Sequence, residues 1–170
     1  NIGVKQFIKE KLPKIKNSNM KIIANFFGNK EEEYLKVAEM LDGVKEIFAL
    51  EMNVSCPNVK VGGLHFGQDP KLMNKLTASV KKRISKPLIV KLTPNVTDIA
   101  QIAKAAEDGG ADAVSMINTL KAMVIDIRTG KPTLGGITGG LSGKAIKPVA
   151  VRCVYEAAKK VKIPIIGLGG

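Results

Sequence analysis

The sequence predicts an α/β fold in which short parallel strands alternate with longer helices. Five short apolar runs recur along the chain, and each ends in polar residues or glycine. Helical patterns separate these runs, and the runs themselves are almost continuously apolar, as in strands of a parallel sheet covered by helices. A chain of 170 residues with 45% hydrophobic residues can bury one core, so we expect a single domain over residues 1–170.

Each element follows from a local pattern. The strands are expected at 20–28, 46–57, 87–95, 113–119 and 163–170. The helices are expected at 31–42, 70–84, 97–108 and 145–161. In the third helix, Ile99, Ile102 and Ala106 share one face, Asp98 can cap the start, and Gly109 can end it. The stretch between Leu120 and Lys147 fits neither pattern, and a connection of this length is usually functional.

Residues with chemically useful side chains or backbones gather where the expected strands end. These residues are Asn25, Asn53, Cys56, Lys91, Asn118 and Gly169. Polar groups converging from several consecutive strand ends are typical of the active-site face of a TIM (β/α)8 barrel, whereas an open doubly wound sheet usually binds at one switch point. Five strands do not close a barrel that needs eight strands and about 250 residues. We therefore expect a partial barrel, with N- and C-terminal parts missing.

Composition narrows the possible classes of protein. The net charge of +12 comes almost entirely from lysines interspersed with glutamates, which favours a solvated surface over a nucleic-acid interface. The two cysteines are far apart and lack metal-ligand spacing, so neither a disulfide scaffold nor a zinc site is predicted. No apolar run is long enough to span a membrane, and the first residues do not resemble a secretion signal. We expect a cytoplasmic protein that binds neither nucleic acid nor membrane.

The densest group of polar residues is the segment from Asn53 to Asn58. Cys56 follows a buried strand, and Asn53 and Asn58 flank it with donors and acceptors suited to a planar, amide-rich ligand. A nucleophilic cysteine usually needs a histidine partner. The one histidine, His65, lies in a glycine-rich loop, so Cys56 is interpreted as a general acid or base. Residues 59–68 are expected to form a mobile lid.

Two further features suggest an anionic ligand. Lys91 interrupts an apolar strand, and a lysine there must pair with an anion or lose its proton. Glycines at 135–143 precede a helix, and 167–170 carries three more, which suits a phosphate bound by backbone N–H groups. The spacing matches neither a Walker loop nor a dinucleotide fingerprint.

Several blocks in order resemble class 1B dihydroorotate dehydrogenases. They are NVSCPNVKVGG, KLTPNVTDIA, MINTLKAMVIDI, GGLSGKAIKPVAVR and IPIIGLGG, which extend over essentially the whole chain. Ile2 stands where the family usually has proline. The family also has a flavin-contacting lysine and a substrate loop before the position of Asn1, and a final phosphate-binding strand.

The resemblance implies a role for each matching position. Cys56 corresponds to the catalytic base. The cofactor positions, which would line FMN, are Asn25, Asn53, Lys91, Ile117, Gly143, Gly169 and Gly170. The substrate positions are Asn53, Asn58, Asn118 and Thr119.

The implied reaction is oxidation of dihydroorotate to orotate in pyrimidine (UMP) synthesis. The family passes electrons to NAD through a second subunit that carries FAD and a 2Fe–2S cluster, and a homodimer within a heterotetramer is expected. A tRNA dihydrouridine synthase, also an FMN barrel with a cysteine after an asparagine, is one alternative, and the charge would suit RNA. A non-catalytic ligand-binding barrel is another.

Overall fold

The protein is described by a computed structural model, which covers residues 2–15, 20–55 and 66–170. Five parallel strands form the main sheet: β1 (Ile22–Phe26), β2 (Ile47–Asn53), β3 (Leu88–Leu92), β4 (Ala113–Met116) and β9 (Ile165–Gly167). Four longer helices alternate with them: α3 (Glu31–Asp42), α4 (Pro70–Lys81), α5 (Ile99–Asp108) and α6 (Lys147–Ala158). Before β1 lie the short α1 (Val4–Gln6), a π-helical segment (Phe7–Lys11) and α2 (Leu12–Ile15).

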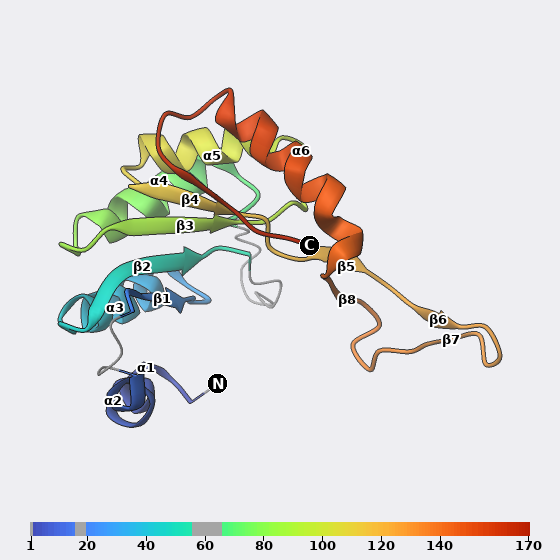
Figure 1. Cartoon of the computed structure of the whole chain (residues 1–170), viewed down its shortest axis with the longest axis horizontal. Coiled ribbons are helices and arrows are strands. Elements are labelled where there is room, and N and C mark those ends of the chain that lie inside the picture. Colours follow the sequence, from blue (N-terminus) through green and yellow to red (C-terminus); the bar gives the residue numbers. More distant parts are fainter. Residues whose placement is uncertain (1, 16–19, 56–65) are drawn as a thin grey trace.

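The strand order decides between the two sheet types that the sequence allows. The order is β1-β2-β3-β4-β9, and every neighbouring pair is parallel. Each strand therefore steps to the same side of the one before it, as in a barrel, whereas a doubly wound sheet reverses direction at a switch point. Helices α4, α5 and α6 run along one face of the curved sheet (Figure 1), and each packs against the next. These features confirm the expected partial barrel.

The two faces of the sheet differ in chemistry because alternate side chains of a strand point to opposite sides. On the face toward the helices, Leu88, Val90 and Leu92 of β3 are completely buried, as are Val114 and Met116 of β4. These residues form the core together with the apolar faces of α4 and α5. The opposite face, which lines the interior of a barrel, carries the polar side chains Asn25, Glu51, Lys91 and Ser115.

Two of the helices begin at an aspartate whose side chain caps them. Asp69 begins α4 by accepting hydrogen bonds from the N–H groups of Lys71 (2.7 Å) and Leu72 (3.0 Å). Asp98 begins α5 by accepting one from Gln101 N–H at 2.9 Å, so the helix starts at Ile99 and not at residue 97. No helix in the described part of the chain is long and apolar enough to cross a membrane.

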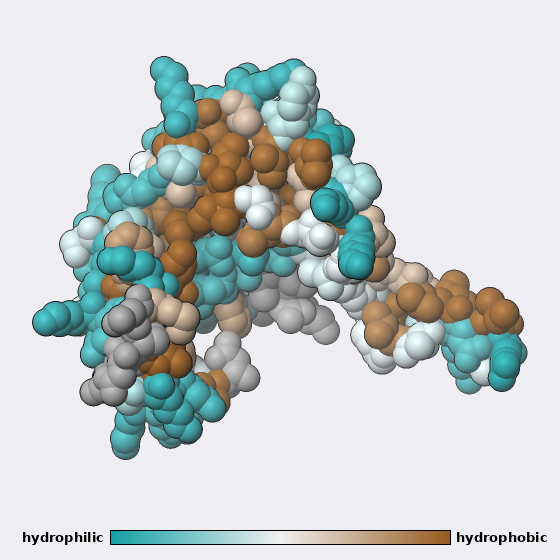
Figure 2. Space-filling model, in the orientation of Figure 1, coloured by the Kyte–Doolittle hydropathy of each residue, from teal (hydrophilic) through white to brown (hydrophobic). Residues whose placement is uncertain are grey.

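The region between β4 and α6 is more ordered than the sequence suggests. It contains two antiparallel pairs: β5 (Leu120–Ala122) with β8 (Gly139–Leu141), and β6 (Ile125–Asp126) with β7 (Lys131–Pro132). Together they form an arm that extends away from the sheet (Figure 1) and bears many hydrophobic side chains (Figure 2). A 3-10 turn, Lys144–Ile146, then leads into α6. The expectation of an irregular stretch was wrong, because strands of two or three residues are too short to show alternation.

Acidic side chains fasten the loops at the amino ends of the strands. Asp42 at the end of α3 accepts hydrogen bonds from the N–H groups of Ser85 and Lys86 just before β3. Glu107 near the end of α5 does the same for Lys162 and Ile163 before β9. These contacts join each helix end to a loop farther along the chain, at the end of the barrel where conserved positions usually serve stability.

Candidate active site

Three of the predicted site residues meet at the carboxyl ends of β2, β3 and β4. Asn53 and Lys91 are register partners in neighbouring strands. Asn118, two residues beyond β4, donates a hydrogen bond from Nδ2 to Asn53 Oδ1 at 3.2 Å. The same oxygen accepts the N–H of Ser55 at 3.0 Å, and Asn118 Oδ1 accepts the N–H of Thr119 at 2.9 Å. The asparagine side chains are thus held in fixed orientations by neighbours.

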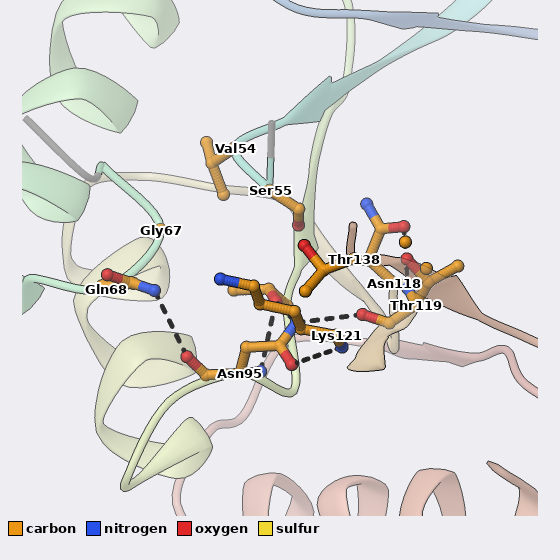
Figure 3. Close-up of a pocket in the computed structure, with 12 residues that line it drawn as sticks. Val54, Ser55, Gly67, Gln68, Asn95, Asn118, Thr119, Lys121 and Thr138 are labelled. Carbon is orange, nitrogen blue, oxygen red and sulfur yellow. Dashed lines mark hydrogen bonds between the residues drawn. The ribbon is translucent and has the colours of Figure 1, made fainter. Parts of the chain in front are cut away.

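A cavity of about 250 Å³ opens beside this group (Figure 3). It is lined by Val54, Ser55, Gly67, Gln68, Thr93, Asn95, Asn118, Thr119, Lys121, Thr138, Gly139 and Gly140. The lining offers amides, hydroxyls and one ammonium, a donor-rich set that suits a small, planar, anionic ligand. Asn118 and Thr119 of the predicted set line this cavity, whereas Asn25, Lys91 and Gly169 do not.

Asn95 was not predicted from the sequence, yet its side chain organises the wall of the cavity. Its Nδ2 donates to Thr93 Oγ1 (2.9 Å) and to the carbonyl of Thr119 (3.0 Å), and its Oδ1 accepts the N–H of Lys121 (2.9 Å). Gln68 Nε2 lies 3.4 Å from the Asn95 carbonyl. The sequence signal that marks Asn95 is its place after Pro94 at a strand end, four residues after Lys91.

A second polar cluster lies on the barrel-interior face of the sheet and centres on Glu51, which sequence reasoning also missed. Its carboxylate accepts hydrogen bonds from Asn25 Nδ2 (2.5 Å) and Ser115 Oγ (2.7 Å). The ammonium of Lys91 is 3.9 Å away. Asn25 and Lys91 therefore share one partner. Asn25 also borders another cavity, of about 570 Å³, at the open edge of β1.

The predicted glycines flank the start of α6: Gly143 precedes the 3-10 turn that leads into it, and Gly169 and Gly170 follow β9. Gly143, Gly169 and Gly170 have φ values of 86°, 118° and 94°, which favour glycine. A Cβ atom at Gly170 would lie only 2.5 Å from the Cβ of Lys147. Only glycine, which has no side chain, therefore lets the backbone at position 170 lie this close to α6. A Cβ at Gly169 would meet Ile117 at 3.3 Å. Glycine backbone at the amino end of a helix, beside Lys144 and Lys147, fits a phosphate group.

The remaining predicted features lie outside the described residues. They are the proposed base Cys56, Asn58, and all but the last three residues of the 59–68 lid. Among the residues that are described, no cluster of three or more histidine, cysteine, aspartate or glutamate side chains is arranged to hold a metal ion. The described part of the site thus consists of amides, hydroxyls, lysines and one carboxylate.

The sequence of residues 1–170 matches the dihydroorotate dehydrogenase family from end to end. The chain belongs to the dihydroorotate dehydrogenase family. Among curated relatives, it is 54% identical to a protein of Citrifermentans bemidjiense and 56% identical to one of Caldicellulosiruptor saccharolyticus, each over 170 residues. A protein of Maridesulfovibrio salexigens is 54% identical over 171 residues. All three are named dihydroorotate dehydrogenase B (NAD(+)), catalytic subunit.

These alignments cover all of the chain but only 56% of each dihydroorotate dehydrogenase. The chain therefore spans a little over half the length of these relatives. Membership in the family agrees with the TIM-barrel order of the five parallel strands.

Proposed function

We propose that this chain is part of the catalytic subunit of an enzyme that oxidises dihydroorotate to orotate in pyrimidine synthesis. The observation that carries the proposal is the match over the whole chain, at 54–56% identity, to catalytic subunits of that name. The convergence of Asn53, Lys91 and Asn118 at one end of the sheet supports it. The same match favours the dehydrogenase over a tRNA-modifying enzyme or a non-catalytic barrel.

FMN fits the residues present. Gly143, Gly169 and Gly170 would hold its phosphate at the amino end of α6, where glycine allows close backbone approach. The flavin itself would be lined by Asn25, Asn53, Lys91 and Ile117. When bound, FMN would supply the acceptor for the hydride that leaves the substrate ring.

The chain's own groups would bind the substrate and move one proton. Asn53, Asn58, Asn118 and Thr119 would orient the pyrimidine ring through their amides and hydroxyl. The thiolate of Cys56 would accept the proton from the ring carbon beside the carboxamide carbonyl, as the hydride leaves the neighbouring carbon. Lys91 would stabilise the negative charge that this transfer creates.

We further propose that the electrons reach NAD through a partner subunit. The words "catalytic subunit" and "NAD(+)" in the relatives' names support a partner of this kind. That partner would carry FAD and a 2Fe–2S cluster, as the resemblance to class 1B dihydroorotate dehydrogenases implies. The working assembly would be a homodimer of catalytic subunits within a heterotetramer in the cytoplasm.

The test is the absorption spectrum of the purified full-length catalytic subunit. A flavin spectrum that bleaches when dihydroorotate is added without oxygen is the expected result. A flavin spectrum that dihydroorotate does not bleach would contradict the proposed substrate. A colourless protein that does not take up added FMN would favour the non-catalytic barrel, and retention of tRNA well above physiological salt would favour the RNA-modifying enzyme.

A further inference from the structure

Glu51 places a carboxylate inside the barrel, where an unpaired charge would be costly. Its side chain is only 14% exposed. Two neutral donors hold it from different strands: Asn25 on β1 and Ser115 on β4, the latter completely buried. Because these donors come from strands on either side, they hold both oxygens of the carboxylate in one orientation.

Lys91 lies on β3, the strand between Glu51 and Ser115. Its ammonium is 3.9 Å from the carboxylate, which is close enough for attraction but too long for a hydrogen bond. The three N–H donors of Lys91 are therefore not consumed by this pair. A fixed negative charge at this distance restrains the ammonium electrostatically and leaves its donors available to another anion.

We propose that Glu51 is a positioning residue that holds Lys91 and Asn25 in the orientation in which they meet the flavin. Ser115 has the supporting role of anchoring the carboxylate. This inference rests on the proposed function, because Lys91 and Asn25 line the flavin only if FMN binds here. It adds two residues, Glu51 and Ser115, that act on the cofactor through others.

The experiment compares FMN affinity in Glu51→Gln, Lys91→Met and the double variant of the full-length catalytic subunit, measured by quenching of FMN fluorescence. Glu51→Gln should weaken FMN binding about tenfold or more, the loss expected when one charge-assisted contact is disturbed. In the Lys91→Met background the same change should weaken binding less than about twofold, because the ammonium that the charge restrains is gone and a glutamine oxygen can still accept the hydrogen bond from Asn25. A residue with only a structural role would have equal effects in both backgrounds.

Glu31 offers a matched control on the outside of the barrel. It also accepts a serine hydroxyl, Ser79 Oγ at 2.8 Å, and also faces a lysine, Lys75 Nζ at 3.4 Å. Glu31→Gln should leave FMN affinity unchanged. If Glu51→Gln does not fold, Ser115→Ala tests the same point, with a smaller weakening that also disappears in the Lys91→Met background.

Three outcomes would overturn the inference. The first is unchanged FMN affinity in Glu51→Gln, and the second is equal weakening with and without Lys91. Either would leave the proposed function intact if the unmodified subunit still binds FMN and is bleached by dihydroorotate. The third, failure of the unmodified subunit to bind FMN, would remove the proposed function and this inference together.

Discussion

At the scale of single residues, the side chain of Asn95 joins the segment after β3 to residues 119–121 at the start of β5. Asn95→Ala would remove these hydrogen bonds and release the start of β5, which directly follows the cavity-lining residues Asn118 and Thr119. Because Asn95 is exposed, we expect a modest loss of stability, about 0.5–1.5 kcal/mol in denaturant unfolding. Orotate affinity should fall several-fold in a titration followed by flavin absorbance.

Gln68→Ala is the control for this change, since Gln68 makes a single long contact in the same cavity. Its effect on orotate affinity should be clearly smaller. Equal effects of the two variants would show that Asn95 does not organise the wall of the cavity.

Cys56 is the residue on which the proposed chemistry depends. Cys56→Ala should retain FMN but slow its reduction by dihydroorotate by at least about 10²-fold, the lower range for losing a general base. Cys56→Ser should also be slow, because a hydroxyl ionises far less readily than a thiol. Stopped-flow absorbance without oxygen measures both rates.

Cys153 provides the matched control for the thiol. It is fully buried in α6, and burial raises the pKa of its thiol, so it stays protonated at neutral pH. In the Cys153→Ala enzyme, dihydroorotate should reduce the flavin at the same rate as in the unmodified enzyme. A Cys56→Ala enzyme whose flavin was also reduced at that rate would refute the assignment of the base.

The residues of the site could be found from the sequence only where one local signal marked them. Asn53 and Asn118 stood at strand ends, and the structure brings them together. Glu51 carried the same signal as Lys91, a charge within an apolar strand, but its partners Asn25 and Ser115 are 26 and 64 residues away. A network between distant strands requires the register of the sheet, which one sequence does not provide.

At the scale of elements, the start of α4 depends on Asp69, which accepts two backbone N–H groups. Asp69→Ala should lower the free energy of unfolding by about 1 kcal/mol, as measured by denaturant titration. Lys30, at the start of α3, makes no capping hydrogen bond through its side chain, so Lys30→Ala should change stability by less than about 0.5 kcal/mol. Equal losses in the two variants would contradict the role of the Asp69 cap.

The elements were predicted well where their patterns were long. The expected helix at 31–42 coincides with α3, and all five expected strands contain the observed ones. The expected strands were too long at their C-terminal ends: β3 ends at Leu92 and β4 at Met116, three residues before the expected end in each case. The arm was missed, since its pairing depends on contacts across the 120–141 segment and not on local periodicity.

At the scale of the whole molecule, the acidic contacts at the amino ends of the strands make stability depend on pH. Burial raises the pKa of Asp42, but hydrogen bonds from Lys86 and Ser85 lower it more, so the pKa lies below its ordinary value. The side chain of Lys104, followed by the N–H of Lys162, lowers the pKa of Glu107.

A carboxylate with a lowered pKa stabilises the folded state when it is ionised, and that stability is lost as pH falls through the lowered pKa. We therefore expect the thermal unfolding midpoint to be constant near neutral pH and to fall below about pH 4.5. Asp42→Asn should lower the midpoint at neutral pH and reduce its dependence on acid. A midpoint that falls equally steeply in Asp42→Asn and the unmodified protein would contradict this account.

The consecutive order of the five strands also bears on how the chain folds as it is synthesised. In the main sheet, β2, β3, β4 and β9 each pair with a strand that precedes them in the chain, so the docking site of each already exists when it leaves the ribosome. Every pairing of this five-stranded sheet can be completed in the order of translation, without waiting for a later strand to be inserted between two earlier ones. The sheet can therefore grow strand by strand as the ribosome synthesises the chain. Nascent chains stalled after β3 or β4 should already resist proteolysis.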